Sequence, residues 1–362
     1  MQTGEIYPAS EAVTSRTQVW GEPFQTPTRE TFPPVGYAVY RDAVVMTTRQ
    51  FPYLLAGSEV MVGSRRAPGP WKMPRRHNRV RHQDGYSVLL DTGEGPHLDV
   101  DHALLLGGHD FTNWYHWLVD CLPQLFLAER LPEPYRRWPV LIPEQIRRYP
   151  TMVHALELFL ESREIIWLPE WALVHAREVV WLDSLEISNI PESLTDTTDE
   201  ARIHMLHREG MEAYRDRYLA EFCPNDPPHE RKVFLIRSGT RRIYNQDQVI
   251  EVARRHGFEP IAPDTLTLAE QVRLFRESRH IIGPSGAGFA GVLFCQPETN
   301  VLCWQDSRIR DMTILPDLAT LNHSTFDHIF YEAEDGGVFT SSYTLDTVWL
   351  EGILQRFVED SR

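Results

Sequence analysis

Residues 232–304 constrain the fold most strongly, because apolar runs alternate there with amphipathic segments. "KVFLIR" at 232–237, "HIIG" at 280–283 and "NVLCW" at 300–304 are short apolar runs bounded by polar or turn residues, which is typical of buried strands. "FEPIA" at 258–262 supplies another strand. The resulting β-α-β-α-β-α-β order predicts an α/β fold with a parallel sheet and right-handed crossovers. Ligands of such sheets bind beyond the carboxyl ends of the strands.

Capping signals mark the helices between these strands. Thr267 and Glu270 form a T-x-x-E capping box, which predicts a helix start at this point. We expect Asn245 and Gln248 to cap the preceding helix in the same way. Gly257 follows that helix, where a glycine cap belongs.

A glycine-rich loop, "GPSGAG" at 283–288, leaves the third of these strands and enters a short apolar helix, "GFAGVLF". Glycine lets a backbone approach a ligand closely, and a helix N-terminus offers unpaired N–H groups and partial positive charge. This arrangement favours an anion such as a diphosphate. The alternative is a tight strand-to-helix turn that needs glycine only for steric reasons.

Arginines follow the first of the strands, in "RSGTRRIYN" at 237–245. Arg237 and the pair Arg241 and Arg242 place positive charge at the edge where the glycine loop is expected. Guanidinium groups bind phosphate oxygens in a bidentate manner. A solvated basic loop is the alternative, but two anion-binding elements at one edge favour the phosphate interpretation.

The first half of the chain carries "NWYHWLVD" at 113–120, within a predicted helix from Trp114 to about Arg130. His116 and Asp120 are four residues apart and therefore share a helical face. An imidazole and a carboxylate at this spacing are typical of a general base with its orienting partner. The alternative is a core histidine beside a local hydrogen-bonding carboxylate. Pro123 is expected to kink or end the helix.

Composition excludes some classes of protein. The chain carries 36 basic and 51 acidic residues, a net charge of −15, which argues against a general nucleic-acid binder. Its four cysteines form no CxxC pair, the N-terminus has no signal-peptide pattern, and no apolar run approaches the roughly 20 residues of a membrane span. We expect a cytoplasmic location. One basic stretch, 64–82, is either a solvated loop or a binding site for an anionic acceptor.

The motifs of both halves resemble those of family 61 glycosyltransferases. "NWYHWLVD", then "RSGTRRIYN", then "GPSGAGFAGVLF" occur in the family's order, over roughly residues 105–305. The resemblance implies a GT-B fold, in which two Rossmann-like domains face each other across a cleft. The proline-rich stretch at 223–230 predicts a domain boundary, and the Pro-, Thr- and Glu-rich composition of residues 1–35 predicts an extended arm. With this boundary, the resemblance implies an N-terminal acceptor-side domain at 1–224, with a β-rich extension. It also implies a nucleotide-sugar-binding domain at 225–345 and a helix at 346–362 that crosses back to the first domain.

The resemblance also assigns roles to residues. Asp120 is the expected base and His116 the second choice. The donor-side positions are Arg237, Arg241, Asn245, Ser285, Gly286, Ala287 and Gly288. This chain departs from the family at three places: Ser285 stands where histidine is usual, Gly291 where asparagine is usual, and Cys303 where glutamate often occurs.

Taken together, these features predict an inverting glycosyltransferase that moves a sugar from a nucleotide-sugar, expected to be UDP-linked, to a hydroxyl of a polysaccharide-pathway acceptor. The resemblance implies single displacement with no metal and no cofactor besides this co-substrate. The acceptor could be a glycan or lipid-linked, with peripheral membrane association or a homodimer as further options. The alternative is a catalytically silent binding protein, which the three departures favour. A Rossmann oxidoreductase fits poorly, because the glycine loop follows the third strand of its domain and not the first.

Overall fold

A computed structural model of the chain describes residues 2–48, 52–61, 80–84, 87–108, 110–188, 204–239, 242–333, 337 and 340–359. The chain divides into two compact units. Unit 1 comprises Met1–Ser10 and Thr31–Glu186, and unit 2 comprises Glu11–Glu30 and Ile187–Arg362. Arg241 and residues 64–79 of the basic stretch lie outside the described residues.

Unit 1 is built on a mixed sheet. Within the described residues its eight strands are β1 (Gln2–Tyr7), β5 (Val35–Thr47), β6 (Pro52–Ala56), β7 (Glu59–Met61), β10 (His97–Leu105), β11 (Val140–Pro143), β12 (Ile165–Leu168) and β13 (Leu173–Leu182). Their order is β12-β11-β10-β13-β5-β6-β7, and β1 pairs with β5 off this path. The first four strands of that order run parallel, whereas the pairs made by β5, β6, β7 and β1 are antiparallel. A separate hairpin is formed by β8 (Val80–Asp84) and β9 (Ser87–Leu90).

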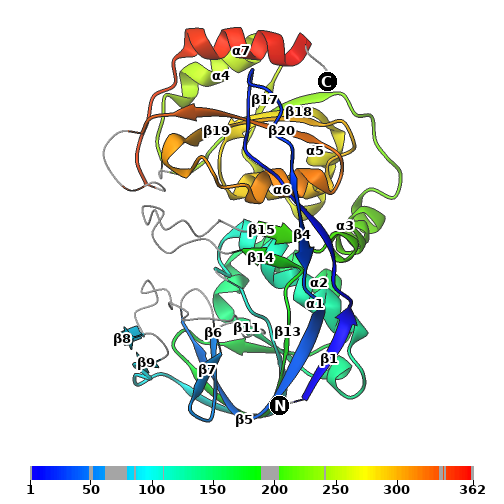
Figure 1. Ribbon diagram of the computed structural model, residues 1–362, viewed down its shortest axis with the longest axis vertical. Helices are drawn as coiled ribbons and strands as arrows, with labels where there is room; N and C mark the ends of the chain where they lie inside the picture. Colours follow the sequence, from blue (N-terminus) through cyan, green and yellow to red (C-terminus); the bar gives the residue numbers. More distant parts are fainter. Residues whose placement is uncertain are drawn as a thin grey trace. The chain divides into compact units, whose positions relative to one another are not determined.

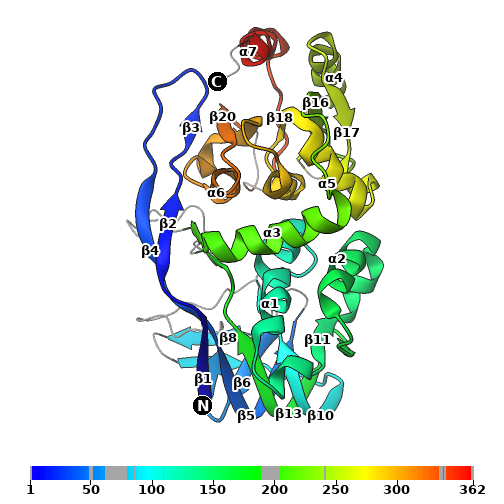
Figure 2. The same cartoon turned by 90° about the vertical axis from the view of Figure 1, so that its right-hand side faces the viewer.

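Helices cover one side of this sheet. The chain leaves β10 into a helical run made of η2 (His116–Cys121), α1 (Leu122–Leu127) and η3 (Ala128–Arg130). Figure 2 shows α1 beside α2 (Pro150–Leu160), both on the same side of the strands. Short 3-10 turns, η4 (Tyr135–Arg137) and η5 (Glu144–Arg148), connect these elements. The carboxyl-terminal part of β10 is therefore buried, and the loop that follows it leads directly into the helix carrying His116.

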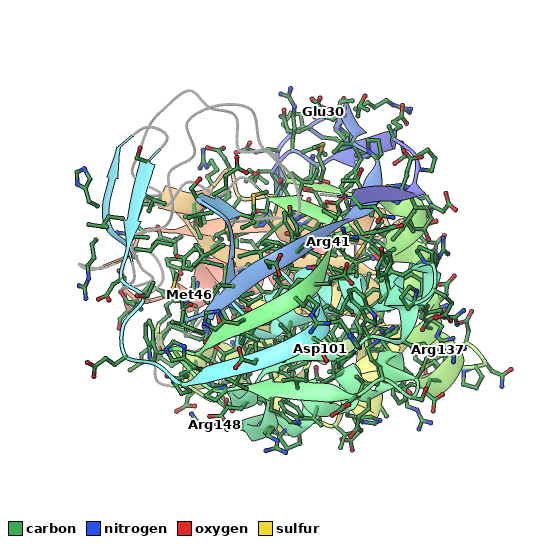
Figure 3. The ribbon with its side chains drawn as sticks, turned by 90° about the horizontal axis from the view of Figure 1, so that it is seen from below. Glu30, Arg41, Met46, Asp101, Arg137 and Arg148 are labelled. Atoms are coloured by element: carbon green, nitrogen blue, oxygen red, sulfur yellow. The ribbon has the colours of Figure 1, made fainter. Side chains whose placement is uncertain are left out.

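Figure 3 shows β5, β13 and β10 side by side, with Arg41 and Asp101 labelled. Two cross-strand ion pairs join these strands, Arg41 to Glu178 and Arg177 to Asp101, each at 3.1 Å. Exposed pairs of this kind contribute little to stability. They do keep this part of the sheet polar.

Unit 2 contains the parallel sheet that the sequence predicts. Within the described residues its order is β17-β16-β18-β19-β20-β3, and all the pairings between these strands are parallel. The strands are β16 (Arg231–Leu235), β17 (Glu259–Ile261), β18 (Ser278–Pro284), β19 (Asn300–Asp306), β20 (Thr325–Tyr331) and β3 (Gln18–Val19). The mixed α/β fold, the parallel sheet and the β-rich N-terminal region are therefore confirmed.

Helices cover both faces of this sheet, as Figure 1 shows. On one face, α4 (Gln246–Arg255) and α7 (Thr347–Glu359) pack on alternate strand residues in a core that includes Phe234, Ile282 and Trp304. On the other face lie α5 (Leu268–Glu277), the 3-10 helix η7 (Ala287–Phe294) and α6 (Ile314–Thr320), with α3 (Arg208–Phe222) against α5. Short elements complete the unit: β14 (Glu186–Ser188), β15 (His204–Leu206), η6 (Pro263–Thr265) and η8 (Ser307–Ile309).

The packing of α7 accounts for its apolar face. Leu350, Ile353, Leu354 and Phe357 are buried in the core of unit 2. The crossing of this helix to the first domain, which the resemblance to GT-B proteins implies, stays a prediction. The described packing of its apolar face lies wholly within unit 2.

The N-terminal arm contributes strands to unit 2. β2 (Ser10–Thr14) pairs with β4 (Thr28–Phe32), and β3 extends the sheet beside β20. A buried pair anchors the arm: His204 Nδ1 lies 2.7 Å from Asp317 Oδ2, and Asp317 Oδ1 accepts the backbone N–H of Ser15. Thr14 donates its hydroxyl to the carbonyl of His204 at 3.1 Å. Segments more than 180 residues apart in sequence are thus held together.

Candidate active site

The helical run that carries His116 begins at a polar loop. Asp110 accepts hydrogen bonds from the N–H and hydroxyl of Thr112, and Asn113 Oδ1 accepts the N–H of Tyr115 at 2.9 Å. These bonds satisfy donors that a helix N-terminus leaves unpaired. Asn113 therefore caps the start of this helical run, and its carbonyl accepts the N–H of Trp117 at 2.9 Å.

The run contains a π turn at His116–Cys121. The N–H of Leu122 donates to the carbonyl of Trp117, five residues back. Pro123 follows at the start of α1 and has no N–H to donate. The Gln124 side chain donates to the carbonyls of Asp120 and Gly107, both at 2.9 Å, and accepts the N–H of Gly107 at 2.8 Å. Single π turns occur frequently at functional sites.

The π turn places the predicted pair together. His116 Nδ1 lies 3.6 Å from Asp120 Oδ2. The imidazole side chain is 20% exposed and the carboxylate 8% exposed, so the imidazole is the more accessible of the two groups. The ring of Tyr115 meets the imidazole edge to face, with centroids 5.4 Å apart.

Gly108 makes room for the Cys121 side chain, next to this carboxylate. Its φ is +149°, and a β-carbon there would lie 3.5 Å from Asp120 Oδ2 and overlap Cys121 Sγ. Burial raises the pKa of the Cys121 thiol most. The negative charges of Asp120, Glu186 and Asp110 raise it further. Glu186, which accepts a hydrogen bond from the Tyr115 hydroxyl at 3.3 Å, was missed by the sequence reasoning because it lies 66 residues beyond Asp120. The local environment is therefore acidic.

In unit 2 the predicted motifs meet at one point of the sheet. β16, the first strand of the core sheet in chain order, lies between β17 and β18, so the order of connection reverses between β16 and β18. The crevice at such a reversal, beyond the carboxyl ends of the strands, is the usual ligand site of these sheets. Arg237 follows β16, and Ser285 to Gly288 follow β18.

Arg237 holds the glycine loop. Its Nη2 donates to the carbonyl of Ser285, and its backbone N–H donates to Gln246 Oε1 at 2.9 Å. A β-carbon on Gly286 would lie 3.2 Å from this Nη2, so glycine lets the guanidinium approach the backbone. Arg237 forms no ion pair with any carboxylate of the described residues, which leaves its charge available for an anion.

Ser285, at the position where the family usually has histidine, is part of a buried chain of hydrogen bonds. Its hydroxyl donates to Gln305 Oε1 at 3.0 Å, and Gln305 Nε2 donates to the carbonyl of Ile309 at 2.7 Å. The N–H of Ser285 donates to the carbonyl of Trp304. Ser285 therefore fixes the loop to β19.

Asn245 has a structural role in unit 2. Its Nδ2 donates to the carbonyl of Leu345 at 3.0 Å, and its Oδ1 accepts the N–H of Leu345 at 2.9 Å. Nδ2 also donates to Gln248 Oε1 at 2.9 Å. The predicted Asn245–Gln248 capping box is wrong, because the side chain of Asn245 makes no cap bond to the helix, whereas the Thr267–Glu270 box is confirmed. The donor-side role of Asn245 stays a prediction.

The other two departures from the family have a local explanation. A β-carbon on Gly291 would lie 2.6 Å from Cζ of Phe275 and closer still to its Cδ2 and Cε2, so this position faces α5 and not the sheet edge. Cys303 is fully buried, and burial raises the pKa of its thiol to about 12, against the opposing effects of Arg237, Ser285 and Arg242. Cys303 on β19 pairs with Gly283 of β18, at the start of the glycine loop.

A family model described as Glycosyltransferase 61 matches residues 114–302, more than half of the chain. The chain belongs to the glycosyltransferase 61 family. The match begins at the helical run that carries His116 and Asp120, and it ends at Leu302 on β19. It therefore contains both candidate sites, and the predicted resemblance is confirmed.

Family membership makes this protein a glycosyltransferase, which acts on a sugar donor and an acceptor. No curated protein matches the sequence. In the part of the chain that the structure describes, no helix is long and apolar enough to cross a membrane. The same residues contain no group of three or more His, Cys, Asp and Glu side chains arranged to hold a metal.

Proposed function

We propose that this glycosyltransferase transfers a sugar from a UDP-linked donor to a hydroxyl of a polysaccharide-pathway acceptor, with inversion by a single displacement. In this proposal unit 2 binds the donor and unit 1 binds the acceptor, in a GT-B arrangement inside the cytoplasm. The observation that supports it most is the position of Arg237 and the glycine loop, side by side at the reversal point of a parallel sheet.

Departure of the diphosphate is the first chemical requirement. The bond from the anomeric carbon to the diphosphate breaks as the acceptor oxygen attacks, and negative charge develops on the leaving group. Arg237 and the amides that begin η7 lie where this charge would be stabilised. Fixed donors of this kind cost no reorganisation during the reaction, so they lower the barrier more than water would.

Removal of the acceptor proton is the second requirement. The sequence favoured Asp120 for this step, but the exposed fractions of the two side chains favour His116 as the base. Asp120, which is more deeply buried and 3.6 Å from Nδ1, then orients the imidazole and stabilises its protonated form. A positioned base contributes about 10²–10⁴-fold to the rate.

Two substitutions test this order. We expect His116→Gln to lower kcat with UDP-sugars by about 10²–10⁴-fold and Asp120→Asn to lower it by less, because the orienting carboxylate contributes less than the base. Both variants should bind UDP as the wild type does. His154→Gln on α2 and Asp101→Asn on β10 are exposed controls in the same unit.

A larger loss in Asp120→Asn than in His116→Gln would return the base role to Asp120. A wild-type protein that binds UDP-sugars but releases no sugar, to water or to any acceptor glycan, would contradict the proposed transfer. Product stereochemistry, followed by NMR of the anomeric proton, tests inversion directly.

A further inference from the structure

Gln124 connects the end of β10 to the turn that carries the candidate base. Its side chain lies on α1 and is buried. The Nε2 group donates to the carbonyls of Gly107 and Asp120, both at 2.9 Å, and Oε1 accepts the N–H of Gly107 at 2.8 Å. One amide therefore joins a residue just beyond the strand to a residue of the π turn.

Gly107 is held on two sides. It is buried, and its N–H and its carbonyl both bond to the Gln124 amide. Residues of neighbouring strands pair by two bonds of this kind. A β-carbon on Gly107 would lie 2.8 Å from Trp181 Nε1 on β13, so the backbone is also enclosed from that side. Because buried backbone groups require partners, loss of the amide would leave Gly107 unstable in this position.

The carbonyl of Asp120 is held from two directions as well. Besides Gln124 Nε2, Ser184 Oγ donates to it at 3.2 Å. Ser184 Oγ in turn accepts the N–H of Glu186 at 3.1 Å, so the segment after β13 is bonded to the same point. Side chains from two other places in unit 1 therefore fix the backbone of Asp120.

The carboxylate of Asp120 extends from this fixed backbone toward His116, with 3.6 Å between Oδ2 and Nδ1. One residue further along the turn, Cys121 Sγ fills the space of a Gly108 β-carbon. The end of β10 thus meets the turn through this thiol and through the Gln124 amide. A displacement at this junction would move the carboxylate relative to the imidazole.

We propose that Gln124 is a positioning residue for glycosyl transfer, whose amide holds the Asp120 carboxylate beside His116 for removal of the acceptor proton. This inference rests on the proposed function, because Gln124 acts through that pair and touches no substrate. A misplacement of about 1 Å can cost about 10²-fold in rate. The donor, which unit 2 is proposed to bind, should be held as tightly with or without this amide.

Gln124→Met, in the full-length protein, removes all three bonds and keeps a side chain of similar length. We expect kcat with UDP-sugars to fall by about 10–100-fold, while KM for the UDP-sugar and Kd for UDP stay as in the wild type. A loss confined to kcat distinguishes positioning of the base from a change in donor binding.

Gln124→Glu separates the donated bonds from the accepted one. It still accepts the N–H of Gly107, but it donates only when the new carboxyl group is protonated. The titratable groups at this end of β10 are Asp110, His116, Asp120, Cys121 and Glu186. Burial and the carboxylates among them should raise the pKa of the new group above the usual value of about 4.3. The ratio of the variant's kcat to that of the wild type should fall as pH rises through that pKa.

Gln271→Glu on α5 is the matched control, because this buried glutamine also donates to a backbone carbonyl, that of Leu266 at 3.2 Å. Urea unfolding at each pH gives the fraction of folded protein, and each rate is divided by it, so that lost stability alone changes no rate. Gln124→Glu at low pH serves where Gln124→Met does not fold.

A wild-type kcat in Gln124→Met, with His116→Gln impaired, would refute the positioning role and leave the proposed function intact. A Gln124→Glu ratio that is the same at every pH would also refute it, because the donated bonds would then not matter. So would a weaker Kd for UDP that accounts for the whole loss. An unimpaired His116→Gln would instead remove the proposed base itself.

Discussion

Gly291→Ala should destabilise the protein because the space for a β-carbon is already filled. Phe275 is 1% exposed. Its Cζ atom lies 2.6 Å from the position of that β-carbon, and two other atoms of its ring lie closer. Neither group can move into solvent. Overpacking of this kind costs about 1–3 kcal/mol. Gly291→Asn, which restores the residue usual in the family, also buries an amide, and we expect a total loss of roughly 2–6 kcal/mol.

Chemical denaturation monitored by tryptophan fluorescence measures both losses. Gly352→Ala on α7 is the control, because no atom lies within 4 Å of its β-carbon position. There the helical preference of alanine should stabilise by up to about 1 kcal/mol. The double variant Gly291→Ala with Phe275→Leu should lose less than the sum of its single changes. A Gly291→Ala protein as stable as the wild type would refute the packing that places this position against α5.

Other predictions concern stability and the site. Burial lowers the pKa of His328 to about 4 from 6.5, so the unfolded state binds more protons between these values and stability falls by about 3 kcal/mol as the pH drops through that window. In the variant His328→Phe, the denaturation midpoint should depend less on pH over that range. A pH dependence equal to that of the wild type would contradict this. Asn245→Ala should cost about 1–3 kcal/mol through its lost bonds to Leu345, more than Gln248→Ala, and the reverse ranking in urea unfolding would argue against this structural role. Gly108→Ala should displace Cys121 and lower turnover while UDP affinity holds; unchanged kinetics would count against this geometry.

The sequence predicts the part of the fold that depends on local pattern. The buried runs at 232–237, 280–283 and 300–304 correspond to parallel strands, and the Thr267–Glu270 box begins α5 as expected. These features follow from apolar runs and caps within a few residues, so no distant contact is needed to predict them.

Features that depend on distant partners are not predictable in this way. β3 has two residues and becomes part of the sheet only because β20, over 300 residues later, lies beside it. The bonds of Asn245 go to Leu345, 100 residues away, so a local capping rule fails there. The π turn at His116 shares its apolar pattern with an α-helix, so the pattern alone does not predict it.

Binding of a nucleoside diphosphate at Arg237 is the claim on which the account depends most. Isothermal titration of UDP into the wild type and into Arg237→Gln, with Arg254→Gln as control, measures it directly. The account predicts that UDP binds the wild type and the control alike and binds Arg237→Gln about 10–100-fold more weakly. Equal affinity for all three proteins would place the nucleotide elsewhere and contradict the account.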